Sequence, residues 1–346
     1  MAATNQGEMP TARPRWSVGR VLLLAVTALC LYVFAPSIAE VFQAWDKLGD
    51  VHPAAIPAIL ALEAGSFWCM WMLQRIALGT HGWFPVITTQ LAGNAFNRIT
   101  PGGGATGTVL QARMLADAGF DAAKAGTAVT AQSILITAAV VTLPIFAVPA
   151  ILLGTAVPSD LESGMWIGGV VFVTMLVIGS LLLATRRPVE ALGRGIERIA
   201  NLFRMRSKPP IRDLGPRLVA ERDELRQAMG SRWVEAVGAS IGRWAFEYFA
   251  LLAILFAIGA RPDIWLVLLA FVAASVLGMV PFSPGGLGFV EAGLTATLAV
   301  SGISTGEALL ATLVFRLVSF WLPIPVGLIA AWIFRRRYPR SGVAVR

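Results

Sequence analysis

The stretch Pro281-Phe282-Ser283-Pro284-Gly285-Gly286-Leu287-Gly288 interrupts an otherwise apolar part of the chain, and Asn97-Arg98-Ile99-Thr100-Pro101-Gly102-Gly103-Gly104 does the same in the first half. Proline removes a backbone donor and glycine relaxes the chain, so each stretch is expected to break a membrane helix. A broken helix at bilayer depth is tolerated where protein or a polar cavity satisfies the freed backbone groups. Paired breaks in the two halves of a membrane protein indicate a transport site.

The composition indicates a polytopic membrane protein with an all-α fold. Apolar residues make up 56% of the 346 residues, charged residues make up 14%, and the mean hydropathy is +0.71. A soluble domain carries about a quarter charged residues, and continuous apolar runs of about 20 residues favour membrane helices over a porin-type barrel. Such runs predict spans at residues 17–36, 54–74, 124–150, 165–185, 232–259 and 307–334. Two further apolar stretches, 84–115 and 264–301, contain the breaks.

The distribution of basic residues predicts which side of the membrane each loop faces. The basic N-terminal segment and the Arg-rich loop 186–231 are expected in the cytoplasm, because loops rich in Lys and Arg stay inside. Loop 151–164 carries acidic residues without Lys or Arg, which suits the outside. The last span ends at Arg335-Arg336-Arg337, so both termini are expected to be cytoplasmic.

These markers predict a single transmembrane domain, residues 17–335, with cytoplasmic tails at 1–16 and 336–346. The N-terminal run is similar to a signal peptide, but Pro36 after the cleavage-like Val33-Phe34-Ala35 favours a retained first helix. Within loop 186–231, residues 188–204 are predicted to form an interfacial amphipathic helix, followed by a second polar helix at 213–229. A solvated loop without a specific role is the alternative.

The same markers constrain the two broken stretches. The chain is inside at Arg75 and inside again at Lys124, so stretch 84–115 is expected to enter and leave from the cytoplasm. Its short apolar arms favour a re-entrant hairpin over two full spans. Stretch 264–301 is expected to form a hairpin from the opposite face, so that residues 54–150 and 232–334 form an inverted repeat. Pro101 lies 183 residues before Pro284, which supports this relation.

Charged residues inside apolar spans are costly, and each needs a partner or a polar surrounding. Arg243 and Glu247 lie four residues apart on one expected helix and can pair with each other. Glu63 is a further candidate charge partner. The charged residues of this kind are Glu63, Arg98, Arg243, Glu247, Glu291 and Arg316.

Three of these residues are candidate substrate contacts. Arg98 precedes the first break, where the next helix would present free N–H groups to an anion. Glu291 falls in the first turn of the helix expected near Gly288, as a capping carboxylate or as a partner for Arg316 or a substrate amine. Arg316 lies in the middle third of the last span, and its planar fork suits a phosphate or carboxylate. A structural tie to Glu291 or Glu247 is the alternative for Arg316.

Several other functions find no support in the sequence. The net charge of +8 is explained by loops beside the spans and by attraction to the anionic cytoplasmic leaflet, not by nucleic acid. The two cysteines and two histidines show no metal-ligand spacing. Gly102-Gly103-Gly104 lacks the Lys-Ser/Thr of a phosphate-binding loop, and no nucleophile–base arrangement is visible. The chain is therefore expected to be no enzyme and to need no cofactor or ATP hydrolysis.

Two motifs resemble those of a known family. One is Pro284-Gly285-Gly286-Leu287-Gly288-Phe289-Val290-Glu291, followed by Phe315-Arg316-Leu317, Pro323 and Gly327. The other comprises Asn94, Pro101-Gly102-Gly103, Gln111-Ala112-Arg113 and Gly119. Together they resemble the lysylphosphatidylglycerol synthase transmembrane-region family, also called the flippase-like domain family, over residues 20–335.

The resemblance implies a protein related to the flippase portion of bacterial multiple peptide resistance factors, and hence a location in the bacterial plasma membrane. In those proteins a separate soluble domain transfers lysine to phosphatidylglycerol, and that domain is not expected here. Carried over from the family motif, Glu291 and Arg316 would be site residues, and Pro284, Gly285, Gly286 and Gly288 would form the backbone break.

The leading hypothesis is a flippase or transporter of a phospholipid or lipid-linked intermediate with an anionic head group, working without ATP. Opposed half-helix ends would hold the head group through Gly102, Gly103, Gly286 and Gly288, with Arg98, Glu291 and Arg316 as side-chain contacts. The alternative is a membrane scaffold or accessory subunit for a lipid-modifying or glycosyl-transferring enzyme. A membrane enzyme that transfers a lipid head group is a third hypothesis.

Overall fold

The computed structural model describes residues 53–100, 104–143, 185–202, 230–278 and 286–339, with a few single positions between 174 and 223. Within these ranges the chain is helical and contains no strand. A turn of 3-10 helix, Gly230–Arg232, precedes α10, and a π-helical turn, Leu317–Trp321, joins α13 to α14. The helices are α2 (Ala55–Leu78), α3 (Phe84–Ile99), α4 (Gly104–Asp117), α5 (Ala122–Thr142), α8 (Arg186–Leu202), α10 (Trp233–Ala257), α11 (Ile264–Gly278), α12 (Phe289–Val300), α13 (Thr305–Arg316) and α14 (Pro323–Arg337).

Local signals set several helix ends. Helix α2 stops at Gly79, whose left-handed backbone (φ 59°) lets its N–H reach the carbonyls of Arg75 and Ile76. Helix α5 begins after Asp121, whose side chain accepts from the Lys124 N–H at 2.9 Å. Helix α13 begins with a reciprocal Ser304–Glu307 capping box. These ends lie within a few residues of those expected from the sequence.

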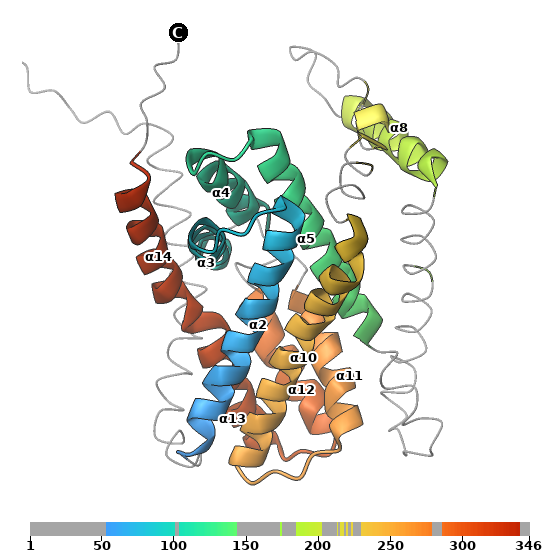
Figure 1. Ribbon diagram of the computed structural model, residues 1–346. Helices are drawn as coiled ribbons and strands as arrows, with labels where there is room; N and C mark the ends of the chain where they lie inside the picture. Colours follow the sequence, from blue (N-terminus) through green and yellow to red (C-terminus); the bar gives the residue numbers. More distant parts are fainter. Residues whose placement is uncertain are drawn as a thin grey trace, which may run out of the picture.

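The helices form an upright bundle with one short hairpin at each end (Figure 1). Helices α2, α5 and α10 and the run from α13 to α14 extend along the bundle. The α3–α4 pair lies at the end where α2 finishes, and the α11–α12 pair lies at the other end, beside the end of α10. The order of long helix, short pair and long helix therefore occurs twice, with the pairs at opposite ends.

Both predicted helix breaks are confirmed on the described side of each break. Helix α3 ends at Ile99 and α4 begins at Gly104, while α11 ends at Gly278 and α12 begins at Phe289. At 1.5 Å per residue the four helices are about 18–24 Å long, shorter than the ~30 Å hydrocarbon core. These lengths suit helices that enter the membrane part-way, and the face from which each pair enters stays a prediction.

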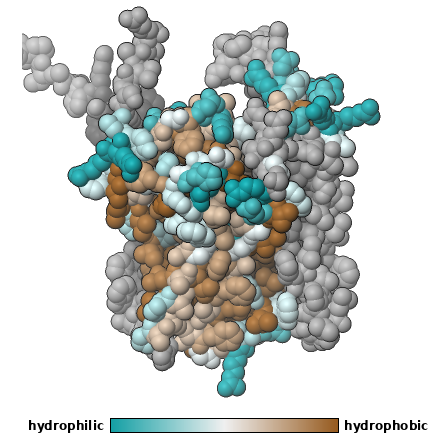
Figure 2. Space-filling view, viewed as in Figure 1, coloured by the Kyte–Doolittle hydropathy of each residue, from teal (hydrophilic) through white to brown (hydrophobic). Residues whose placement is uncertain are grey.

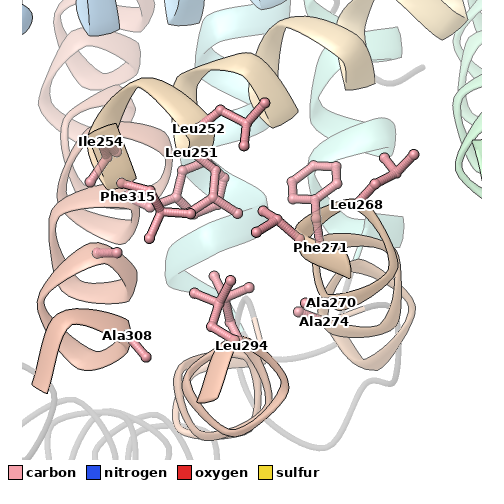
Figure 3. Packing of buried hydrophobic residues seen from close by; sticks show 14 of the residues in the cluster. Leu251, Leu252, Ile254, Leu268, Ala270, Phe271, Ala274, Leu294, Ala308 and Phe315 are labelled. Atoms are coloured by element: carbon pink, nitrogen blue, oxygen red, sulfur yellow. The ribbon is translucent and has the colours of Figure 1, made fainter. Parts of the chain in front are cut away.

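The main hydrophobic core lies between α10 and the α11–α12 pair (Figure 3). Leu251 and Ile254 of α10 and Leu294 of α12 are at most 1% exposed. Phe271 of α11 packs edge-on against Phe315 of α13, with 6.2 Å between the ring centroids. These contacts join α10, α11, α12 and α13 into one packed unit and hold the start of α12 beside the middle of the last span.

Helix length and surface character identify the protein as a polytopic integral membrane protein. In the described part of the chain, α2, α10 and the continuous run Thr305–Arg337 are long and apolar enough to cross a membrane. The visible face of the bundle is apolar along its middle, and its hydrophilic residues gather toward the two ends (Figure 2). Predicted span 17–36 lies outside the described residues, as does the end of span 124–150, and only positions 174 and 185 of span 165–185 are described.

The basic loop is partly described. Helix α8, Arg186–Leu202, overlaps the predicted amphipathic helix at 188–204. It carries the ion pair between Arg186 Nη2 and Asp223 Oδ2, at 2.8 Å. The second predicted helix, 213–229, falls mostly outside the described residues.

Cysteine labelling of intact cells tests the sidedness of both hairpins. In a background with serine at both native cysteine positions, we expect His81→Cys and Ala122→Cys to react only after permeabilisation. Arg261→Cys and Thr305→Cys are expected to react from outside, because they flank the hairpin at the other end of the bundle. All four positions are exposed. If Ala122→Cys and His81→Cys react from different sides, the chain crosses the membrane an odd number of times between them and the hairpin prediction is wrong.

Candidate functional site

Six charged residues from five helices come together inside the bundle. Glu63 interacts electrostatically with Glu247, Arg98 and Arg243. Arg98 and Glu247 also interact with Arg316, which is bonded to Glu291. We call this group the charge cluster; its members are Glu63 of α2, Arg98 of α3, Arg243 and Glu247 of α10, Glu291 of α12 and Arg316 of α13. Three positive and three negative groups thus gather where the spans pack, although 253 residues separate the first from the last.

The most buried pair joins the second break to the last span. Arg316 Nε donates to Glu291 Oε1 at 2.7 Å, and both side chains are more than 90% buried. The other carboxylate oxygen of Glu291 accepts the Gly288 N–H at 2.8 Å. Glu291 therefore caps α12 and also neutralises Arg316, so the two roles considered for it occur together. The prediction that Glu291 and Arg316 lie within side-chain reach is confirmed.

The second pair lies on the middle of α10. Arg243 Nη2 donates to Glu247 Oε1 at 2.9 Å, which confirms the expected pairing of residues four apart. The same oxygen accepts the Ser66 hydroxyl of α2 at 3.4 Å. The Arg243 guanidinium lies 4.0 Å from the Trp244 ring centroid. Its Nε and Nη1 atoms are buried and lack a hydrogen-bond partner in the described part of the chain.

The third arginine reaches from the first break to the last span. Arg98 Nε donates to Asn94 Oδ1 at 2.5 Å, and Arg98 Nη1 donates to the Ser319 carbonyl at 2.6 Å. Arg98 lies in the last turn of α3, where the helix dipole favours a positive charge. Both of these hydrogen bonds go to neutral oxygens, so the charge of Arg98 is balanced through space by Glu63 and Glu247.

Phe320 and the π-helical turn complete the site and were missed from the sequence. The Phe320 ring centroid lies 4.1 Å from the Arg316 guanidinium and 5.0 Å from that of Arg98. Both cations can therefore interact with the same aromatic ring. A π-helical turn is rare and often found at functional sites, and this one presents Ser319 and Phe320 to the arginines. The available signal was the spacing of Ser319 and Phe320, three and four residues after Arg316.

Glu63 differs from the other two carboxylates. It is 95% buried, and its Oε2 atom has no hydrogen-bond partner among the described residues. Its helix α2 packs extensively on α10, and Ser66, one turn along α2, contacts Glu247. Glu63, a candidate charge partner in the sequence, therefore lies on a helix that packs against charged residues of α10, but it makes no close ion pair with a described cation.

The glycines of the two breaks are only partly described. Gly102 and Gly103 lie outside the described residues. Gly286 has φ +71°, and a Cβ there would lie 2.7 Å from Val290 Cγ2, so both backbone shape and close packing call for glycine. The Gly288 N–H is already taken by Glu291. A substrate contact at these glycines, and a polar cavity between the breaks, stay predictions.

Within the described ranges no group of three His, Cys, Asp or Glu side chains could hold a metal ion. The cluster mixes arginines with its carboxylates, and a guanidinium repels a cation. The donor set that the cluster offers is therefore suited to anions and to protons.

The comparisons with known proteins match this membrane architecture. The family model of the lysylphosphatidylglycerol synthase TM region matches residues 20–327. The chain belongs to this family. Every residue of the charge cluster, and Phe320, lies inside the matched range. The family assignment made from the two proline-glycine motifs is thereby confirmed.

Two proteins similar to this chain are membrane proteins of archaea. A UPF0104 membrane protein of Methanothermobacter thermautotrophicus is 22% identical over 322 residues, which cover 90% of this chain and 93% of that protein. A UPF0104 membrane protein of Pyrococcus horikoshii is 30% identical over 84 residues, covering 24% of this chain and 25% of that protein. No solved structure matches the chain. Since these family members are archaeal, the family is not confined to bacteria, and a bacterial plasma membrane stays a prediction for this chain.

Proposed function

We propose that this protein moves a lipid with an anionic head group between the two leaflets of the membrane, without hydrolysing ATP. The observation that carries the proposal is the convergence of three arginines inside a bundle whose surface suits lipid. Charged side chains at bilayer depth are costly and, where present, commonly mark a substrate or ion pathway. A chain that needed only stability would gain little from six of them.

The cluster has unused capacity for an anion. The buried Nε and Nη1 atoms of Arg243 carry N–H groups with no described acceptor. A guanidinium fork can bind two oxygens of a phosphate or carboxylate at once. Arg98 is only partly buried and lies next to the first break, so it can meet a ligand that enters there. The Nε atom of Arg316 already donates to Glu291. We therefore assign Arg98 and Arg243 as the primary head-group contacts and Arg316 as a secondary one.

The arrangement also explains how a lipid could cross. The two hairpins lie at opposite ends of the bundle, and their described ends approach the cluster through Arg98 and Glu291. Rocking of one repeat against the other around a fixed central site is the usual way that inverted repeats alternate access. The acyl chains would stay in the lipid beside the bundle while the head group passes the arginines.

A vesicle assay tests this function. Purified protein reconstituted in phosphatidylcholine vesicles should speed the exposure of head-group-labelled phosphatidylglycerol to a membrane-impermeant quencher. Arg243→Gln/Glu247→Gln removes the guanidinium while keeping the cluster neutral, and we expect it to slow the movement at least tenfold, about 1.4 kcal/mol of lost interaction. The control, Arg335→Gln at the exposed end of α14, should leave the rate unchanged.

Three results would contradict the proposal. Equal rates for labelled phosphatidylcholine and phosphatidylglycerol would mean that the arginines do not select the head group. Normal movement in the double variant would exclude Arg243 as a head-group contact. If the wild type moves no labelled lipid, the accessory or scaffold role becomes the better explanation, and co-purification with a lipid-modifying enzyme would then be the measurement to make.

A further inference from the structure

One carboxylate of the charge cluster, Glu63, has a buried oxygen atom without a hydrogen-bond partner among the described residues. Glu291 is bonded to Arg316 and to the Gly288 N–H, and Glu247 is bonded to Arg243 and Ser66. Glu63 is 95% buried, yet its Oε2 accepts no hydrogen bond from the described residues. An ionised carboxylate accepts hydrogen bonds at both oxygens and is very costly to bury without donors. A proton on Glu63 removes that cost.

The burial of Glu63 and its acidic neighbour Glu247 favour a bound proton, while two arginines oppose it. On α10 it faces Glu247, a second carboxylate, whose charge opposes its own. Arg243 on α10 and Arg98 on α3 attract a negative Glu63, but each already has close oxygen partners. Helix α5 packs on α2 with Gln132 and, at its far end, Lys124, and the π-helical turn carries no charged side chain.

We infer that Glu63 binds a proton that is exchanged as the protein works, and that this proton is the coupling ion for the anionic lipid. The step is a simple association: the Glu63 carboxylate takes one proton to become a neutral carboxyl and releases it on return. The inference about coupling rests on the proposed function, whereas proton binding by Glu63 does not.

The sign of the coupling follows from the charge count. With all six residues ionised the cluster sums to zero, and Glu63 repels an approaching anion. With Glu63 protonated the cluster is positive by one charge, so Arg98 and Arg243 can hold an anionic head group. Proton and anion therefore favour each other's binding, and by thermodynamic reciprocity each raises the affinity for the other equally. The carrier would move lipid and proton together in one direction.

Difference infrared spectroscopy on the full-length protein in phosphatidylcholine nanodiscs tests proton binding without any transport. We expect a titrating band of a buried protonated carboxyl in the wild type. It should be absent from Glu63→Gln and retained in Glu307→Gln, where the acid is replaced at the far end of α13. Glu247→Gln removes the neighbouring negative charge and should shift the titration to lower pH. If Glu63→Gln fails to fold, Glu63→Asp keeps the acid and should move the band rather than abolish it.

The coupling is tested in the vesicle assay with labelled phosphatidylglycerol. One linked proton changes the rate by at most tenfold per pH unit, so wild type should show a dependence that approaches this limit, while Glu63→Gln should be independent of pH. An unchanged carboxyl band in Glu63→Gln, or a wild type without such a band between pH 4 and 9, overturns the inference. If the band is lost in Glu63→Gln but the wild type moves no lipid, the proton site on Glu63 is supported and the flippase function is refuted. Lipid movement with the same pH dependence in both proteins refutes coupling through Glu63.

Discussion

Arg316→Gln should unfold far more easily than the wild type, with a loss of about 3–5 kcal/mol in unfolding free energy. The reason is that Glu291, 92% buried at its side chain, would lose the guanidinium 2.7 Å away and keep its charge. Removing one partner of a buried pair leaves an uncompensated charge, which costs more than the pair itself contributes. Denaturant titration in mild detergent, followed by tryptophan fluorescence, measures the effect.

Companion variants separate charge from shape. Arg316→Gln/Glu291→Gln removes both charges, so it should recover much of the stability lost in the single variant. Arg316→Lys keeps the charge but loses the planar fork that contacts Glu291 and stacks on Phe320, and we expect normal insertion with slower lipid movement. Arg335→Gln, at an exposed position, is the matched control and should change stability by less than about 0.5 kcal/mol. If Arg316→Lys moves lipid normally but is destabilised, Arg316 is structural and contributes nothing to head-group passage.

Gly327→Ala is expected to give a severe packing defect between α14 and α3. A Cβ at this position would lie 2.3 Å from the Leu91 carbonyl oxygen and 2.5 Å from Ala95 Cβ, both on α3. These atoms belong to a helix, so they cannot move aside as the tip of a flexible side chain could. Small residues let membrane helices approach this closely, and the contact between α14 and α3 is one of the most extensive in the protein. We expect a loss of about 1–3 kcal/mol.

The same substitution should also reach the site. Helix α3 carries Arg98 and the run into α14 carries Phe320, so pushing α14 away from α3 separates the groups that meet at the cluster. Lipid movement should therefore fall together with stability. Gly238→Ala is the matched control, because it lies inside α10 with no atom within 4 Å of the new Cβ, and alanine favours a helix by about 0.5–1 kcal/mol. A Gly327→Ala protein as stable as Gly238→Ala would mean that α3 and α14 do not pack as described.

Much of the fold follows from local chemistry and was therefore accessible from the sequence. The helix breaks at Pro101 and Pro284 follow from a missing N–H and free glycine dihedrals, and α3 and α11 do end before them. The pairing of Arg243 with Glu247 needs only the helical repeat. The cap at Gly288 by Glu291 likewise spans three residues. Each of these interactions is made within one or two turns, so no knowledge of the fold is needed.

The candidate site was accessible only in part. The cost of charge in a membrane identified all six members of the cluster, because such residues are rare and must be explained. It predicted that Glu291 lies within reach of Arg316 but left a tie to Glu247 open as an alternative. It also gave no weight to Phe320 or Ser319, which look like ordinary core residues until a guanidinium from another helix lies against them.

By itself, then, the sequence determined that this is an all-α membrane protein with two broken helices and six charges at bilayer depth, since these depend on composition and on contacts a few residues long. The tertiary structure alone decided that Arg98 reaches Ser319, 221 residues away, and that Phe320 lies against both Arg98 and Arg316. It also left Glu63 without a hydrogen-bond donor at Oε2 among the described residues. The physical reason is that such contacts depend on how α2, α3, α10, α12 and α13 pack, and packing is set by the shapes of whole helices rather than by any local pattern.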